Sequence, residues 1–179
     1  MSSVTEHRIN RLRRPAIVAS ASLALTLALA ITATAPSRAD TPVPINVELL
    51  TGRAQFTDDV SAQFRLKLDG MGTNVMNIAD PSRTVVANIT VQPGARFPWH
   101  THPGPVIVNV ASGELVYQMA HDCVERSYVA GTAFVDPGRG MVHTAFNRTG
   151  AATVIIATFF EVPAAGPLTI TEGVTPGTC

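Results

Sequence analysis

Short apolar segments separated by glycine and proline are the feature that most limits the fold of this chain. All 13 glycines and 11 of the 13 prolines lie after residue 39, so turn residues interrupt that part closely. Within it, residues 62–68 and 84–92 alternate apolar and polar side chains, which is the pattern of a half-buried strand. No stretch after residue 39 shows a sustained helical period. The sequence therefore predicts an all-β domain built from short strands.

Further strands are predicted in the second half of the chain. Short strands at regular spacing are typical of a barrel or a sandwich. The predicted strands cover residues 105–111, 114–119, 132–135, 142–146 and 152–160. Residues 69–82 mix Gly, Asn, Asp and Pro and are expected to form a loop with at most one short strand. Residues 40–46 are expected to form an extended, Pro-rich arm.

The first 39 residues have the layout of an export signal. The basic residues Arg11, Arg13 and Arg14 precede an apolar run over residues 16–35, and small residues then flank a candidate cleavage site after Ala39. We expect a bacterial protein that is secreted or extracytoplasmic and has no membrane association after cleavage. Because the apolar run is longer than usual, an uncleaved N-terminal anchor is the alternative. The sequence leaves both general and twin-arginine export open.

The charges of the chain are unevenly placed, although 13 basic side chains balance 13 acidic ones. Residues 1–39 carry a net charge of +4, and residues 40–179 carry −4 with Lys67 as the sole lysine. Proteins that bind nucleic acid need clustered positive charge to meet the phosphate backbone. The acidic balance of residues 40–179 therefore excludes nucleic acid as a partner.

The chain has two cysteines, Cys123 and Cys179. Export would place them in an oxidising compartment, where an even number of cysteines usually pairs. A disulfide would close a loop of roughly 56 residues, tie down the C-terminal tail and contribute about 4 kcal/mol in the chain-entropy model. A thiolate metal ligand or nucleophile is the alternative, but no His-Cys spacing supports it.

Three histidines are placed to form a metal site. His100 and His102 are separated by one residue, so both imidazoles would point to the same face of a strand, and His143 lies on another predicted strand. Three neutral imidazoles that converge can bind one divalent transition metal, namely Fe, Mn, Zn, Cu or Ni. The alternative is a metal-free pocket whose histidines only form hydrogen bonds. His121 is expected to be a solvated loop residue.

These histidines fall within two motifs that resemble those of the cupin superfamily. Residues 94–113 have the pattern Gly-x5-His-x-His-x3-Val-x6-Gly, which is similar to the first cupin motif. Residues 131–147 have the pattern Gly-x5-Pro-x2-Gly-x2-His-x3-Asn, which is similar to the second. The resemblance implies a cupin-type double-stranded β-helix, or jelly-roll barrel, in which His100, His102 and His143 bind a metal.

The resemblance also implies an organisation for the whole chain. Residues 84–160 would be the cupin core. A signal peptide or anchor over residues 1–39 would precede it, followed by an arm and leading strands over residues 40–83. Residues 161–179 would form a C-terminal tail tethered by Cys179. Because cupins often pair through their strands, the family also suggests a homodimer.

The chain departs from the family pattern at two places. The second motif has one extra residue between Pro and Gly, and Val106 stands where the first motif has a metal-binding Glu. The remaining acids considered as substitutes, Glu114, Glu125 and Glu161, are not at motif spacing. The predicted pocket residues are Val106, Gln118, Trp99 and Phe146. The charged groups Arg96 and Arg139 are expected either to meet an anionic substrate at the barrel mouth or to be ordinary surface charges.

The sequence leaves three functions open. A three-His metal with free coordination positions suits a metal-dependent, dioxygenase-like enzyme that acts on a small molecule. The same site suits a secreted, non-enzymatic protein that binds a small ligand. It also suits a structural domain in which the metal and the disulfide serve stability alone. No residue pattern selects a substrate or establishes catalysis.

Overall fold

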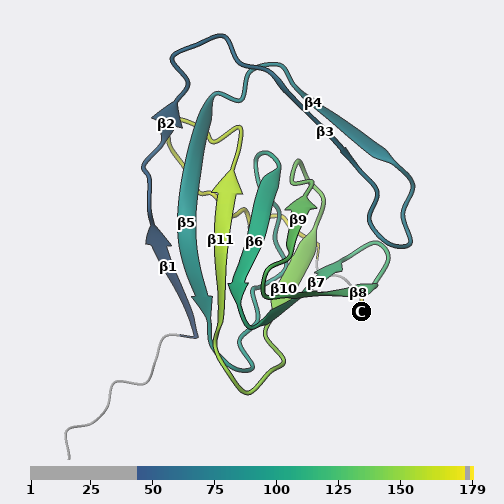
Figure 1. The fold of residues 1–179 in the computed structure, drawn as a ribbon. Helices are drawn as coiled ribbons and strands as arrows, with labels where there is room; N and C mark the ends of the chain where they lie inside the picture. Colours follow the sequence, from purple (N-terminus) through teal and green to yellow (C-terminus); the bar gives the residue numbers. More distant parts are fainter. Residues whose placement is uncertain (1–43, 176–177) are drawn as a thin grey trace, which may run out of the picture. The chain divides into compact units, whose positions relative to one another are not determined.

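The structure, a computed structural model, describes residues 44–175 and 178–179. Within these ranges the chain consists of eleven strands and connecting loops without a helix, which confirms the predicted all-β class (Figure 1). Accordingly, no helix in the described part of the chain could cross a membrane. The predicted signal peptide, residues 1–39, lies outside the described residues, as do residues 40–43 of the predicted arm.

The strands form three antiparallel sheets. They are β1 (Ile45–Leu49), β2 (Ala54–Gln55), β3 (Ala62–Leu66), β4 (Asn74–Ile78), β5 (Arg83–Val91), β6 (Val106–Ser112), β7 (Glu114–Met119), β8 (Glu125–Val129), β9 (Ala133–Asp136), β10 (His143–Phe146) and β11 (Thr153–Phe159). The largest sheet has the order β1-β5-β11-β6-β9, with β2 paired to the end of β5. The second sheet has the order β10-β7-β8, and β3 pairs with β4 alone.

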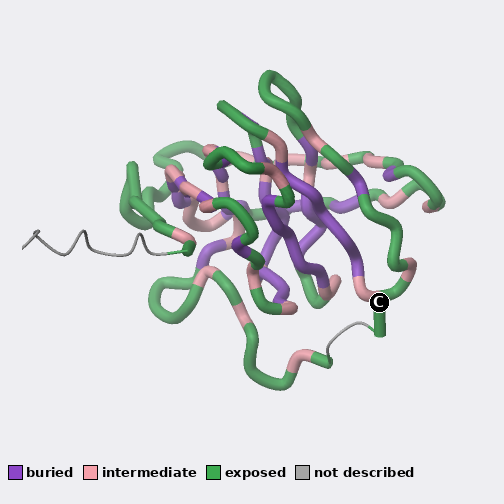
Figure 2. Tube along the Cα trace, turned by 90° about the horizontal axis from the view of Figure 1, so that it is seen from below, coloured by how far each residue is buried: buried purple, intermediate pink, exposed green. Residues whose placement is uncertain are grey.

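The core combines side chains from the two larger sheets. β5 and β11 bury every second residue, as their alternating sequences predict. Their inward side chains form one apolar cluster with residues of β6, β7, β9 and β10. The buried strands run through the middle of the described chain, and exposed loops surround them (Figure 2). Two strand layers thus enclose the space in which the histidines lie.

All seven predicted strands are present within two residues of their expected bounds, and the described chain has four others, namely β1, β2, β4 and β8. β1 continues three residues beyond the predicted arm, and β2 has two exposed residues. β4 is the one short strand that the prediction for residues 69–82 allowed. β8 escaped prediction because its one buried side chain is the charged Arg126. The hydrophobic alternation that marks a strand is therefore absent from β8.

The segment after residue 162, which we call the C-terminal strap (residues 163–175 and 178–179), has no strand of its own. Its main tie to the barrel is a bridge in which Ile170 and Thr101 exchange both backbone hydrogen bonds, at 2.8 and 3.0 Å. The Arg53 side chain also donates to the carbonyl oxygens of Pro163 and Gly166. The last residue, Cys179, forms the predicted disulfide with Cys123.

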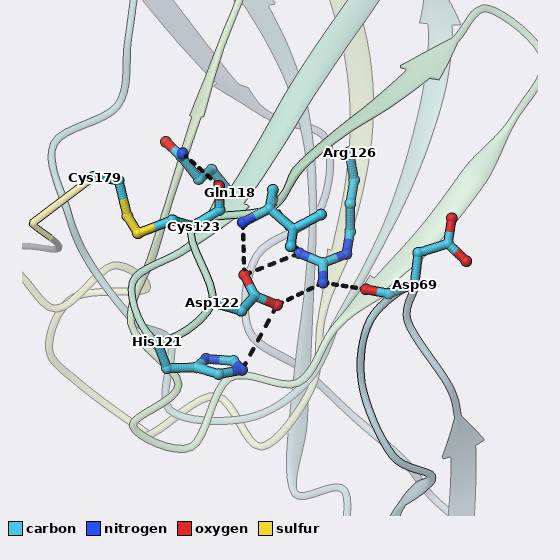
Figure 3. Close-up of polar contacts among 8 residues, drawn as sticks. Asp69, Gln118, His121, Asp122, Cys123, Arg126 and Cys179 are labelled. Carbon is cyan, nitrogen blue, oxygen red and sulfur yellow. Dashed lines mark hydrogen bonds and ion pairs between the residues drawn. A yellow bond between two sulfur atoms is a disulfide. The ribbon is translucent and has the colours of Figure 1, made fainter.

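The disulfide attaches the strap to a braced turn between β7 and β8 (Figure 3). Next to Cys123, the carboxylate of Asp122 forms an ion pair with Arg126 at 2.6 Å. Arg126 also donates to the backbone oxygen of Asp69, on the loop before β4. The strap therefore ends at a turn whose conformation is held by the hydrogen bonds of Asp122 and Arg126.

Candidate metal centre

The three motif histidines meet inside the barrel. His100 and His102 lie on the segment between β5 and β6, and His143 begins β10. The backbones of His100 and His143 form a bridge with two hydrogen bonds of 2.9 Å, which brings the two motifs together. One ligand atom from each of the three rings lies within 4.8 Å of the others, and all three residues are buried. The sequence prediction that the three residues converge is therefore confirmed.

Each imidazole is oriented by a backbone carbonyl. The Nδ1 atom of His100 donates to Pro98 O at 2.7 Å, and that of His143 donates to Met141 O at 3.1 Å. The Nδ1 atom of His102 donates to Leu168 O, in the strap, at 2.7 Å. Because a carbonyl only accepts, these bonds place a proton on Nδ1 and leave Nε2 as the donor atom toward a metal.

A buried carboxylate, Asp136, completes the group, and the sequence analysis missed it. Asp136 ends β9, is 2% exposed and is the direct cross-strand partner of Val106. Its Oδ2 atom lies 2.8 Å from His143 Nε2 and 3.4 Å from His102 Nε2. The acid that the family pattern places at position 106 is thus found on the neighbouring strand. Strand parity could have revealed it, because Asp136 lies two residues after the core residue Phe134.

The turn after β9 holds Asp136 in place. The carboxylate Oδ1 accepts a hydrogen bond from Gly138 N at 2.9 Å and one from the Tyr117 hydroxyl at 3.4 Å. Gly138 has a φ of 58°, and a Cβ atom at this position would lie 1.9 Å from Gly104 O. Only glycine fits such a site. Gly138 is one of the two residues that stand between Pro137 and Gly140, where the family pattern has one.

Burial keeps two of the imidazoles neutral. Burial, together with the nearby imidazoles of His143 and His102, lowers the pKa of His100 to about 3. Burial also lowers the pKa of His102, although the charge of Asp136 acts in the opposite direction. Both residues are therefore neutral at physiological pH, which is the form that binds metal.

Asp136 and His143 form a buried ion pair. Burial acts to raise the pKa of Asp136, but the charge and hydrogen bond of His143 outweigh it, and the pKa is lowered. Burial acts to lower the pKa of His143, but the charge and hydrogen bond of Asp136 raise it. Without a metal, His143 Nε2 therefore carries a proton that it donates to Asp136. A metal ion at this site would replace that proton.

The donor set fits a metal ion. His102 Nε2 and Asp136 Oδ2 face each other at 3.4 Å, and both present lone pairs when His102 is neutral with its proton on Nδ1. Two acceptors at this separation repel each other unless a cation or a proton lies between them. Three imidazoles and one carboxylate suit Fe, Mn, Zn, Ni or Cu.

The centre opens into a cavity of about 350 Å³. The three histidines, Asp136 and Tyr117 form its polar end, and apolar side chains from both sheets form the walls. Residues 167–169 of the strap close one side. Val106 lines the cavity, as predicted. Glu114, Glu125 and Glu161 do not line it, so Asp136 is the acid of this site.

Three predicted pocket residues do not line the cavity, namely Gln118, Trp99 and Phe146. Successive side chains of extended chain point to opposite faces, and each of the three is adjacent in sequence to a residue that does line the cavity (Tyr117, His100 and Ala145). The Gln118 amide instead donates to Cys123 O at 3.2 Å, beside the disulfide (Figure 3).

The charged side chains that the sequence analysis considered for the barrel mouth contact other residues instead of facing the cavity. Arg96 lies 3.6 Å from the centre of the Phe146 ring, and Arg139 pairs with Glu161. Neither arginine lines the cavity. The His121 side chain is 45% exposed, as expected for a loop residue.

A family model described as a cupin domain matches residues 87–159, which contain both histidine motifs and most of the strands around the cavity. Over these residues the chain is similar to the cupin superfamily, which supports the resemblance carried by the two motifs. Its antiparallel sheets agree with the jelly-roll cupin fold that the motifs implied. Its three-His cluster could bind a metal.

Several solved structures are similar to this chain. The cupin domain of an XRE family transcriptional regulator from Enterobacter cloacae shares 17% identity, with a TM-score of 0.44 over 68% of this chain and 99% of that one. A cupin-superfamily sugar phosphate isomerase from Silicibacter pomeroyi shares 27% identity, with a TM-score of 0.40 over 46% of this chain and 53% of that one. A structure from Acidithiobacillus ferrooxidans shares 20% identity, with a TM-score of 0.39 over 44% of this chain and 51% of that one. The chain thus spans about half the length of the last two proteins. No curated protein matches it.

Proposed function

We propose that this cupin is an exported, metal-dependent enzyme of the dioxygenase type that acts on a small molecule. Its metal would be held by His100, His102 and His143, with Asp136 in place of the usual glutamate. The observation that carries the proposal is the orientation of the imidazoles. Each Nδ1 is bonded to a backbone carbonyl, so three Nε2 atoms point toward one another beside a carboxylate. Metal-binding histidines are usually held in this way.

The residues of the chain have separate tasks in this proposal. The neutral His100 and His102 offer lone pairs, while Asp136 accepts the proton of His143 until a metal replaces it. Gly138 and Tyr117 fix Asp136 through hydrogen bonds to Oδ1. The apolar walls exclude water from the space where a substrate would lie.

A bound metal would supply Lewis acidity, and Fe, Mn or Cu would also supply redox chemistry with O2. The walls offer no second acid or base beyond Tyr117, so the chain itself contributes binding, orientation and charge. A cupin that only binds a ligand remains the alternative, and it predicts binding without turnover.

Export is supported by the disulfide, because disulfides persist in oxidising compartments and are rare in the cytosol. The strap that it tethers also supplies the carbonyl oxygen that orients His102. We therefore place the working protein outside the cytoplasm.

Elemental analysis of the exported protein, purified without a histidine tag, tests the proposal. We expect about one equivalent of Fe, Mn or Cu in the wild type and in His121→Ala, which removes a surface histidine as a matched control. His100→Ala and His143→Ala should lose the metal. Equal metal content in all four proteins would refute the site. Oxygen uptake with candidate substrates then tests enzyme against binding protein, because binding without turnover would refute the enzyme alone.

A further inference from the structure

The walls of the cavity have few charged side chains, and this limits the kind of ligand that the cavity can bind. Of the residues that line it in the described chain, none is Lys or Arg. The single acid, Asp136, is already paired with His143 at 2.8 Å. A phosphate or a dianion would therefore lose its hydration on entry without meeting an unpaired cationic side chain, which is strongly unfavourable.

The arginines near the barrel are not free to compensate. Arg139 forms two hydrogen bonds with the carboxylate of Glu161, and Arg148 pairs with Glu125. Arg96 covers the Phe146 ring on the outer side of β10. Each of these groups would have to leave its partner and turn to reach the cavity.

The walls of the cavity favour an apolar molecule. Most of the lining consists of aliphatic and aromatic side chains from both sheets, including Ile89, Ile155, Ala157 and Phe134. A sugar has a hydroxyl group on nearly every carbon, and these hydroxyls would find no hydrogen-bond partners along such walls. The polar side chains of the lining are the three histidines, Asp136 and Tyr117 at one end and Thr169 on the strap, so a ligand can place one polar group at the histidine end.

We propose that the cavity takes a small, mainly apolar molecule with a single oxygen-containing group, such as a phenol or an aryl carboxylic acid, and rejects sugar phosphates. A cavity of about 350 Å³ has room for about ten to fifteen non-hydrogen atoms at ordinary packing. The oxygen group would lie at the histidine end and the ring against the apolar walls. This assignment rests on the proposed function for the role of the metal, but the apolar preference comes from the walls alone.

Calorimetric titration of the full protein, both metal-free and zinc-loaded, tests the assignment. The apolar probes are phenol and benzoate, and the polar probes are glucose and fructose 6-phosphate. We expect phenol to bind both forms and benzoate to bind the zinc form at least 10-fold more tightly, because the charge of His143 is already paired with Asp136 and the metal would add an unpaired positive charge. Fructose 6-phosphate should bind at least 10-fold more weakly than benzoate. Equal or tighter binding of fructose 6-phosphate would overturn the assignment.

Two variants locate the binding. Ala157→Leu fills the cavity from β11 and should weaken phenol binding at least 10-fold without changing the metal content. The matched control Ala133→Leu makes the same change at an exposed position of β9 and should leave binding unchanged. Because Ala157→Leu could fail to fold, Thr169→Arg is the second variant. Thr169 is exposed on the strap and lines the cavity, so an arginine there should raise the affinity for fructose 6-phosphate.

The outcomes separate the two proposals. A protein that takes up no metal but binds phenol in a manner sensitive to Ala157→Leu refutes the metal centre and supports the apolar cavity. A protein that binds metal at the three histidines but prefers fructose 6-phosphate supports the metal centre and refutes the ligand class. Phenol binding that both leucine variants leave unchanged places the ligand outside the cavity and also refutes the assignment.

Discussion

His100 and His143 are oriented from within their own segments, whereas His102 is oriented from the far end of the chain. The carbonyls that accept from His100 and His143 each lie two residues earlier, at Pro98 and Met141. The carbonyl that accepts from His102 is that of Leu168, 66 residues away in the strap. Two of the histidines are thus oriented by the backbone two residues earlier, and the third depends on a segment held by a few contacts and a disulfide.

From this difference we expect the two sides of the cavity to differ in the free energy of local opening. The strand side is built from ladders such as β5 with β11, which pair over seven residues. The strap pairs with the barrel through one bridge. Segments with few backbone hydrogen bonds open locally at lower free energy than paired core strands. We therefore expect the strap to open while the strands stay folded, which would break the hydrogen bond that orients His102.

The largest effect is expected from removal of the disulfide by the double variant Cys123→Ser/Cys179→Ser. The bridge closes a 56-residue separation, so its loss should lower the free energy of unfolding by about 4 kcal/mol in the chain-entropy model. Hydrogen exchange should quicken at Ile170, in the strap, and stay slow at Ile89 and Ala157. Urea denaturation and exchange mass spectrometry measure the two effects. Equal acceleration in strap and strands would contradict the comparison.

Gly138→Ala should disturb the strand side through the turn that holds Asp136. The new Cβ would collide with Gly104 O, so we expect a loss of about 3 kcal/mol in unfolding free energy. Gly131→Ala is the matched control, because Gly131 also has a positive φ but has no atom within 4 Å of the added Cβ. The control should cost about 1 kcal/mol. Similar losses in both variants would show that the close approach to Gly104 is unimportant.

Asp136→Asn should weaken metal binding while it preserves the shape of the side chain. Loss of the carboxylate charge should lower metal affinity by about 10- to 100-fold, as measured by competition with a chelating dye. The additional change Val106→Glu returns an acid to the cross-strand position and should recover part of the affinity. An unchanged affinity in Asp136→Asn would exclude the carboxylate from the centre.

The metal-free protein should become less stable as the pH falls below neutral, in part because of His100. Its lowered pKa of about 3 means that the unfolded chain binds a proton below about pH 6.5 while the folded chain does not. Between pH 7 and 5.5 this should cost about 1 kcal/mol, which His100→Gln should remove. The raised pKa of His143 acts oppositely, because it adds stability as the pH falls through that folded value toward 6.5. Urea titrations at the two pH values, with and without the substitution, isolate the His100 contribution.

The sequence was sufficient to predict the strands that alternate cleanly and the three histidines, because parity and motif spacing are visible in side chains. Asp136 was missed because the search for an acid followed motif spacing along the chain, while the carboxylate is supplied by a cross-strand neighbour of Val106. The role of the strap could not be predicted, because its contribution to His102 is a main-chain oxygen that any residue at position 168 would provide.

The dependence of His102 on the strap also sets an order of assembly. A newly made chain can pair its strands and join His100 to His143 before its last residue is fixed, and the disulfide between Cys179 and Cys123 then adds a covalent tie to the bridge and hydrogen bonds of the strap. Tight metal uptake should therefore follow oxidation of the two thiols. A chain held in a reducing compartment would compete poorly for metal there, and the ion that it finally keeps would be one available where the disulfide forms.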